Sequence, residues 1–177
     1  MTRTFFTCFF ICLLSWKSQA QITLTVSDFA NAGDTVRLSQ MPASTLDFYS
    51  TGPNYTWDFS SLTASTQSLK DYTPIGFGSI LILATYGPFA GSYAATYYNL
   101  TTELPIDQLS AFLPIQLSDL SQYTKRSNTA INSLGYSINV QGQGLPFKSD
   151  TIETRYSLPM SFGDMHDSRG YTFVDLN

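Results

Sequence analysis

Short runs in which apolar and polar residues alternate recur along the chain, and each predicts a β-strand with one buried face. The clearest run covers residues 134–140, where Leu, Tyr, Ile and Val alternate with Gly, Ser and Asn. Its expected partner is the stretch 122–131, joined to it by a tight turn at Asn132-Ser133. Four further strands are predicted at 22–26, 55–59, 152–158 and 171–175.

Turn-forming residues separate these runs. Turns are predicted at 31–34, 51–54, 87–88 and 142–144, where Gly, Pro and Asn gather. Only the stretch 104–120 does not fit a strand, and residues 107–113 within it are predicted to form a short helix that Pro114 ends. Many short strands and little helix predict an all-β fold, an antiparallel β-sandwich of the Ig-like or jelly-roll-like kind.

A long uncharged stretch runs from Tyr72 to Thr102, with the apolar residues Ile80–Leu83 near its middle. A membrane-spanning helix needs about 20 consecutive apolar residues, and here four glycines and two prolines interrupt the stretch. We therefore expect no membrane span in the mature chain. The prediction is two central strands, buried on both faces, that flank the turn at Gly87-Pro88.

The N-terminus has the order of a cleaved secretory signal. Arg3 precedes an uncharged, largely apolar run of about 12 residues, and small or polar residues follow up to Ala20. An uncleaved anchor is the alternative, which the short apolar run and the early Lys17 disfavour. The predicted organisation is a signal peptide at 1–20 and one β-sandwich domain at 21–177, secreted or at the cell surface.

Cleavage would change both the redox chemistry and the charge. It removes Cys8 and Cys12, so the mature chain has no thiol for a disulfide, a nucleophile or a thiolate metal site. It also removes Arg3 and Lys17, which leaves seven basic residues against thirteen acidic ones and a formal charge of −6. Because such a chain repels phosphate backbones, nucleic acid is excluded as a partner.

Three segments carry a resemblance to a known group of proteins. They are Ala32–Thr35 (AGDT) with Gly52–Leu62 (GPNYTWDFSSL), Leu158–Asp164 (LPMSFGD), and Arg169–Phe173 (RGYTF). Together they resemble unassigned secreted β-rich proteins of Bacteroidota-type bacteria, which often carry a C-terminal sorting domain for type IX secretion. The resemblance implies an exported multi-strand protein. Because the sorting domain is absent here, we expect the chain to be the N-terminal part of a longer protein, with a β-sandwich incomplete at its C-terminus.

No motif predicts a catalytic, metal or cofactor site. His166, the only histidine, lies in a polar segment, and adjacent loop residues rarely supply the three or four ligands that a metal needs. No Gly-x-Ser-x-Gly elbow is present to expose a serine nucleophile. Close carboxylate pairs occur where turns are expected, so solvated loop carboxylates are the default: Asp28 with Asp34, Glu103 with Asp107, and Asp164 with Asp167.

Aromatic residues supply the one candidate binding feature. Tyr93, Tyr97 and Tyr98 could form a platform for a sugar ring, because tyrosine has an apolar body and a polar tip; core packing is the alternative. The expected function is a non-catalytic extracellular or cell-surface module, structural, adhesive or interacting, within a larger exported protein. The alternative is a carbohydrate-binding module or the accessory domain of a secreted hydrolase. The expected partners are a glycan or a cell-surface protein.

Overall fold

The structure, a computed structural model, describes residues 22–41, 49, 56, 58–60, 62–76, 79–103, 106 and 115–172. Three predictions lie outside these residues: the signal peptide at 1–20, the turn at 51–54 and the helix at 107–113. The described part is an all-β, antiparallel, sandwich-like fold, as predicted. Within it, no helix combines the length and apolar composition that crossing a membrane requires.

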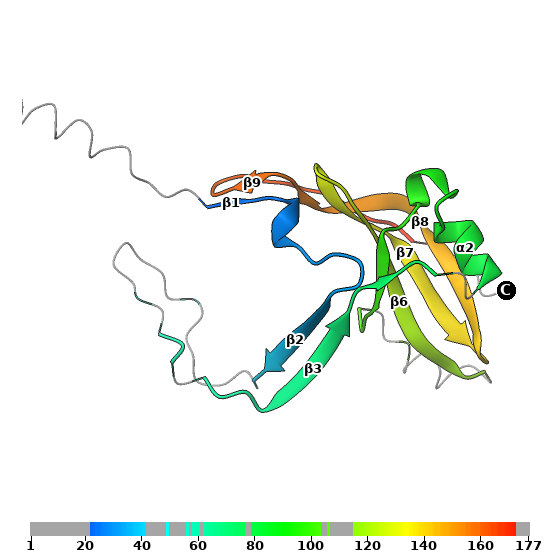
Figure 1. The fold of residues 1–177 in the computed structure, drawn as a ribbon, viewed down its shortest axis with the longest axis horizontal. Helices are drawn as coiled ribbons and strands as arrows, with labels where there is room; N and C mark the ends of the chain where they lie inside the picture. The colour runs from blue at the N-terminus through cyan, green and yellow to red at the C-terminus, as the bar shows by residue number, and fades with distance from the viewer. Residues whose placement is uncertain are drawn as a thin grey trace, which may run out of the picture.

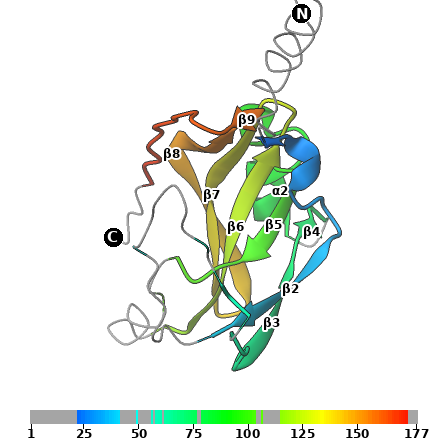
Figure 2. The ribbon, with the colours of Figure 1, turned by 90° about the vertical axis from the view of Figure 1, so that its left-hand side faces the viewer.

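Five antiparallel strands form the principal sheet, and they are neighbours in the order in which the chain makes them (Figures 1 and 2). They are β4 (Thr73–Pro74), β5 (Tyr97–Leu100), β6 (Leu117–Arg126), β7 (Ala130–Val140) and β8 (Gln143–Ser157). Short hairpins, which antiparallel pairing permits, join β6 to β7 and β7 to β8, whereas residues 75–96 lie between β4 and β5 and residues 101–116 between β5 and β6. The predicted strand at 134–140 is thereby confirmed as part of β7, and the one at 152–158 as part of β8 up to Ser157.

The turn between β6 and β7 lies at 127–129 and not at the predicted position, 132–133. Asn132 and Ser133 do not form a turn; they lie inside β7 and pair with Lys125 and Thr124. The chain reverses at 127–129, where the Ser127 hydroxyl oxygen accepts the Ala130 N–H at 3.0 Å. A serine side chain that bonds to the nearby backbone closes a turn without glycine. The pairing of the two predicted strands was right and the position of the turn was wrong.

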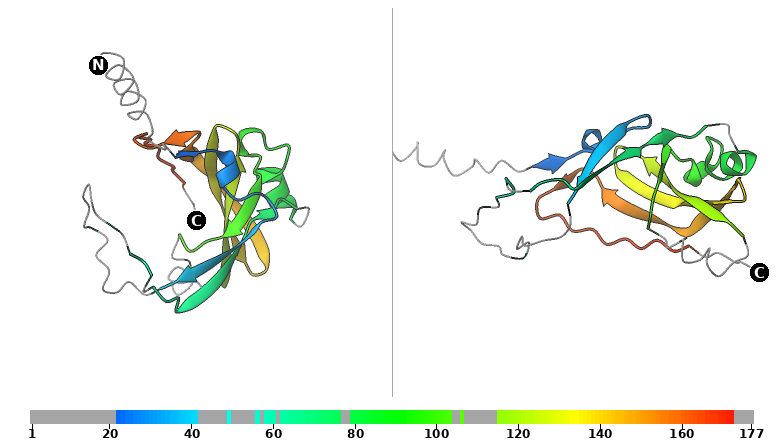
Figure 3. Two further views of the ribbon diagram at one scale, coloured as in Figure 1. Left: turned by 60° about the vertical axis from the view of Figure 1, so that its left-hand side comes forward. Right: turned by 90° about the horizontal axis from the view of Figure 1, so that it is seen from below.

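Two smaller ladders flank the principal sheet (Figure 3). One, here called the ribbon, pairs β2 (Thr35–Gln40) with β3 (Thr66–Asp71). The other pairs β1 (Thr23–Leu24) with β9 (Met160–Ser161). Only Tyr72 separates β3 from β4, so the ribbon continues directly into the edge of the principal sheet.

The strand predicted at 22–26 is shorter than expected. Only β1 is extended, and Val26 begins the 3-10 helix η2 (Val26–Asp28). The Asp28 carboxylate accepts the Thr25 N–H at 2.7 Å, an N-cap contact that ends the extended segment. This hydrogen bond lowers the pKa of Asp28. The guanidinium of Arg126 on β6 then donates to the backbone oxygens of Val26 and Phe29, which fastens this segment to the sheet.

Residues Ile80–Tyr86 form helix α2, where a buried strand was predicted. The Ser79 hydroxyl accepts the Ile82 N–H at the start of the helix, and the Gly87 N–H donates to Leu83 O at its end. A short apolar run has no period that separates a helix from a strand, and here the serine cap and the following Gly-Pro select the helix. After the Gly-Pro turn the chain forms the 3-10 helix η3 (Gly91–Tyr93), and β5 begins only at Tyr97 and is not buried on both faces, so the predicted pair of central strands was wrong.

The core lies between α2 and one face of the principal sheet. Tyr86 and Leu134 are completely buried, and the Tyr86 ring stacks on Tyr123 of β6 with centroids 3.9 Å apart. The Tyr86 hydroxyl reaches the backbone of β8 and donates to Phe147 O at 2.6 Å. Because the phenol is buried, its pKa is raised far above the usual tyrosine value. The core is therefore built on stacked tyrosines, and the hydroxyl of the completely buried Tyr86 has backbone partners.

A bulge at Gly135 breaks the alternation from which β7 was predicted. Leu134 belongs to the core with Tyr86, whereas the Tyr136 hydroxyl donates to Glu103 and its ring stacks on Phe147. The register shifts between residues 133 and 135, which places the residues on either side of the shift on different faces. The expected single buried face of 134–140 was therefore wrong, although the strand itself was right.

The remaining strand predictions had mixed outcomes. Tyr171 makes one isolated bridge with Thr151 and begins no strand among the described residues, and 173–175 lie outside them. Of the predicted strand at 55–59, Phe59 is described and is not in a strand. The stretch 104–120, which was not expected to be extended, contains the start of β6 at Leu117. The turn predicted at 142–144 lies at 141–142, and Gln143 and Gly144 already belong to β8.

Candidate functional site

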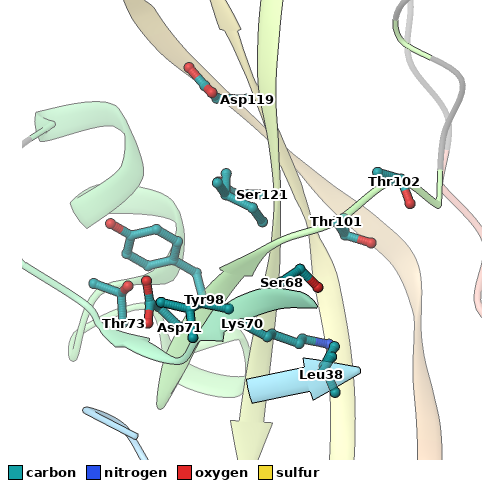
Figure 4. Close-up of a pocket in the computed structure, with 12 residues that line it drawn as sticks. Leu38, Ser68, Lys70, Asp71, Thr73, Tyr98, Thr101, Thr102, Asp119 and Ser121 are labelled. Atoms are coloured by element: carbon teal, nitrogen blue, oxygen red, sulfur yellow. The ribbon is translucent and has the colours of Figure 1, made fainter. Parts of the chain in front are cut away.

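An open groove lies between the ribbon and the principal sheet, here called the ribbon groove (Figure 4). Its volume is about 700 Å³, within the range of ligand pockets in proteins. One wall comes from the ribbon, through Leu38, Ser68, Leu69, Lys70 and Asp71. The other comes from the sheet and the loop after β5, through Thr73, Tyr98, Leu100, Thr101, Thr102, Asp119 and Ser121.

Four consecutive residues of β3, Ser68–Asp71, line the groove, so both faces of this strand contribute to its wall. Leu38 pairs with Ser68, and Val36 pairs with Lys70, so alternate residues of the two strands share one face. On the sheet side, Leu100 pairs with Ser121 in the same way. Most of the groove is thus lined by strand residues, which hold their side chains more firmly than loops would, while Thr101 and Thr102 come from the loop after β5.

Asp119 occupies an unusual backbone position in the sheet wall. Its φ is +50°, in the left-handed region, and the register of β6 with β7 shifts between Ser118 and Ser121. A bulge of this kind inserts an extra residue and redirects a side chain. The Asp119 carboxylate is exposed and accepts from the Ser118 hydroxyl at 3.0 Å. Aspartate is among the residues that tolerate this conformation, and Asp119 lines the groove from this bulge.

Tyr98 forms the aromatic part of the sheet wall. It is partly buried, and its ring stacks on Tyr123 with centroids 5.6 Å apart, which continues the stack from Tyr86. Burial raises the pKa of Tyr123, whose hydroxyl lies 3.1 Å from that of Ser137. The ring at the groove is therefore supported from behind by two further rings.

The charges of the ribbon groove are few and nearly balanced. Lys70 contributes a cation, while Asp71 and Asp119 contribute two carboxylates. The Asp71 carboxylate accepts from the Thr35 hydroxyl at 2.6 Å. The Lys70 ammonium lies 5.4 Å from the centre of the Tyr72 ring, a cation–π distance. A groove with this balance has no strong preference for a highly charged ligand.

Glu103, next to the groove residue Thr102, fastens the loop after β5 to the far side of the sheet. Its two carboxylate oxygens accept from the Arg155 guanidinium at 2.8 and 2.7 Å. The Tyr136 hydroxyl and the Gln122 amide also donate to Glu103, each at 2.9 Å. The hydrogen bonds from Arg155 lower the pKa of Glu103, and the hydrogen bond from Tyr136 lowers it further. The hydrogen bonds between Arg155 and Glu103 also raise the pKa of Arg155.

The three tyrosines of the predicted platform do not form one exposed surface. Tyr97 is buried at 5% exposure and packs edge-on against Tyr72, with centroids 5.1 Å apart. Tyr93 is partly buried, and its hydroxyl donates to Ser149 O at 2.6 Å. Successive strand residues point to opposite faces, so Tyr97 and Tyr98 cannot share a platform. Of the three, only Tyr98 lines the ribbon groove.

His166 lies beside β8, over a shallow depression that Glu153, Arg155 and Asp167 also line. Its Nε2 is 3.1 Å from Thr154 O. Among the described residues, no group of three His, Cys, Asp or Glu side chains is placed to hold a metal ion.

Three of the predicted loop carboxylates serve local turns, whereas Glu103, expected to be a solvated loop carboxylate, instead forms an ion pair with Arg155. Asp34 accepts the Asn31 N–H, and Asp164 accepts the Ser161 N–H, each at 2.7 Å. Asp28 caps η2 in the same way. Asp107, the predicted neighbour of Glu103, lies outside the described residues.

Comparison with known proteins identifies no relative: no family model, no curated protein and no solved structure matches the chain.

Proposed function

We propose that this chain is a non-catalytic extracellular or cell-surface binding module of a larger exported protein, and that the ribbon groove binds a glycan. The observation that carries the proposal is the lining of the groove. Six of its twelve side chains bear a hydroxyl: Ser68, Thr73, Tyr98, Thr101, Thr102 and Ser121.

Hydroxyl groups suit a ligand that is itself rich in hydroxyls, because each partner both donates and accepts hydrogen bonds. Leu38, Leu69 and Leu100 add apolar surface for the C–H faces of a sugar ring, and Tyr98 adds an aromatic ring. The near balance of Lys70 against Asp71 and Asp119 favours a neutral ligand over a phosphorylated one. The groove is open, which suits a polymer that enters from the side.

Export and the non-catalytic role rest on the sequence. The order of charged, apolar and small residues up to Ala20 supports secretion, and the absence of a nucleophile elbow supports a binding role. Turnover of a polysaccharide or peptide by the purified chain would overturn the non-catalytic part of the proposal.

A glycan array that includes glucans, mannans, xylans and chitin oligomers tests the binding. The array is probed with the wild-type chain and with two tryptophan variants of neighbouring β3 residues. Ser68→Trp places a large ring in the ribbon groove, whereas Gln67→Trp places the same ring on the strand position outside the groove lining. We expect Ser68→Trp to weaken binding about tenfold or more, a change of at least about 1.4 kcal/mol, and Gln67→Trp to leave it unchanged. No binding to any glycan would overturn the glycan assignment, and equal losses in both variants would place the glycan site outside the ribbon groove.

A further inference from the structure

A second, smaller cavity adjoins the ribbon groove on the same face of the principal sheet. Its volume is about 270 Å³, and it lies between α2 and the sheet, so we call it the helix cavity. It shares Tyr98, Asp119 and Ser121 with the ribbon groove. Because the same three side chains line both spaces, a ligand that passes them enters one cavity from the other.

The helix cavity contains a buried acceptor that has no partner. Asn139 lines the cavity, and its Oδ1 has no hydrogen-bond partner among the described residues. Its Nδ2 is only 3.5 Å from Asp119 Oδ2, at the limit of a hydrogen bond. Buried polar atoms normally have partners, so the lone acceptor in the wall of this cavity can accept from a ligand once the Asn139 amide turns toward the cavity.

The polar groups of the helix cavity include hydrogen-bond acceptors, which favour a ligand that donates hydrogen bonds. Asp119 supplies carboxylate oxygens and Asn139 supplies an amide oxygen, both acceptors. Ser121 and Ser137 supply hydroxyls, which adapt to either role. The carboxylate disfavours an anionic group in the same place. Sugar hydroxyls meet these requirements, since each can donate to a carboxylate or to an amide oxygen.

We propose that the helix cavity is a second subsite, which binds the next sugar of an oligosaccharide whose preceding units occupy the ribbon groove. This inference rests on the proposed function of the ribbon groove. Asp119 lies at the junction, where the bulge in β6 directs its carboxylate, and accepts hydroxyl donors from the sugar that crosses it. Asn139 Oδ1 accepts a hydroxyl donor from the sugar beyond. The predicted ligand is therefore a linear oligosaccharide, and its affinity depends on chain length.

The test is isothermal titration of the wild-type chain with cello-, laminari-, manno-, xylo- and chito-oligosaccharides of two to six units. We expect one series to show a step of about tenfold in affinity when the chain becomes long enough to reach the helix cavity. In Asn139→Ala the step is lost, while shorter members of the series bind as before. Thermal unfolding of Asn139→Ala stays near that of the wild type, because the amide oxygen has no protein partner to lose.

Asn132→Ala is the matched control. Asn132 is also in β7, and its Oδ1 is also buried without a partner, but it lines neither the ribbon groove nor the helix cavity. We expect this variant to keep the step. Gly144→Leu provides a second test, since a Cβ at Gly144 would meet only the Ile82 side chain, at 3.6 and 3.7 Å, and the larger side chain fills the cavity.

The outcomes separate the two proposals. Binding with no dependence on chain length, or a step that survives both Asn139→Ala and Gly144→Leu, overturns the second subsite and leaves the ribbon groove as the binding site. Failure of every oligosaccharide to bind overturns the proposed function, and with it this inference.

Discussion

The two walls of the ribbon groove are the principal sheet and the ribbon, and they are held in place by different means. The sheet wall is backed by buried side chains of β6 and β7, among them Leu120, Tyr123 and Leu134, at 4% exposure or less. In the ribbon every residue of β2 is exposed, and Lys70 is the only residue of β3 that is not. A two-stranded ladder is marginal on its own, so the ribbon depends on its attachment to the sheet.

Because of this difference, we expect the sheet wall to contribute mainly to folding stability and the ribbon mainly to ligand binding. Burial on the sheet side supplies the free energy of folding and holds Tyr98 and Asp119 in position. The ribbon contributes side chains that contact the ligand space without a core of their own behind them. We therefore expect substitutions in the sheet wall to alter the free energy of unfolding, and substitutions in the ribbon to alter binding.

The largest expected effect is at the bulge beneath the core tyrosine. In Gly135→Ala the new Cβ would lie 2.4 Å from the Tyr86 hydroxyl oxygen and 2.5 Å from Phe147 O, at a φ of +140° that disfavours a side chain. Because backbone atoms cannot yield, we expect a loss of about 4 kcal/mol or more in the free energy of unfolding. Urea denaturation followed by tyrosine fluorescence measures it.

Gly163→Ala is the control for that substitution. Its φ of +93° is also left-handed, but a Cβ there would have no atom within 4 Å. Backbone strain alone then lowers the free energy of unfolding by about 1 kcal/mol. Equal losses of unfolding free energy in the two variants would show that the packing around Tyr86 yields to the added Cβ.

A matched pair of leucines compares the two walls directly. Leu134 is completely buried in β7, and Leu69 in β3 is 63% exposed. We expect Leu134→Ala to lower the free energy of unfolding by about 3 kcal/mol, because it leaves a cavity in the core. Leu69→Ala should cost less than about 0.5 kcal/mol. Chemical denaturation of the two variants measures both values, and a large loss from Leu69→Ala would indicate that the ribbon has a core of its own.

The smallest expected effect is at Glu103, where the groove meets the opposite face of the sheet. The pKa of Glu103 is lowered by its hydrogen bonds from Arg155, so its stabilising contribution is present above the unfolded value of about 4.5 and is lost as pH falls through the folded value. In the ion pair with Arg155, the Glu103 side chain is more than a third exposed. Glu103→Gln should therefore lower the free energy of unfolding by at most about 1 kcal/mol at pH 7.

Unfolding free energies of wild type and Glu103→Gln across pH 3 to 7 test this coupling. The difference between them should shrink toward zero at the acid end, where the wild-type carboxyl becomes protonated. A difference that stays constant across this range would mean that the ion pair is not its source. Combining Glu103→Gln with Arg155→Gln isolates the interaction between the two side chains.

Alternation predicted parts of the long strands, namely residues 134–140 of β7 and the second half of β8. The alternation pattern failed at one short apolar run and at two bulges. Ile80–Leu83 has no period of its own, and only the serine before it and the Gly-Pro after it indicate a helix. Gly135 and Asp119 mark bulges, which arise from the fit between neighbouring strands and so depend on residues distant in the sequence.

The candidate site was partly predictable for the same reason. Tyr98 was selected as a ligand-facing ring and does line the ribbon groove, while Tyr93 and Tyr97 were selected with it and pack elsewhere. Asp119 was missed, although the three-residue spacing of Leu117 and Leu120 interrupts the alternation at that point. The ribbon wall could not be foreseen, because its position depends on how β3 joins β4 in three dimensions.

The short strand β4 has a mechanical consequence. The ribbon reaches the principal sheet through Tyr72 and then through two strand pairs, Thr73 with Tyr98 and Pro74 with Tyr97. Proline donates no backbone N–H, so this junction has fewer hydrogen bonds than its length suggests. A tensile load on the ribbon would therefore peel β4 from β5 one pair at a time, and the sheet edge beside Tyr98 would open long before the load reached the hydrogen bonds between β6 and β7.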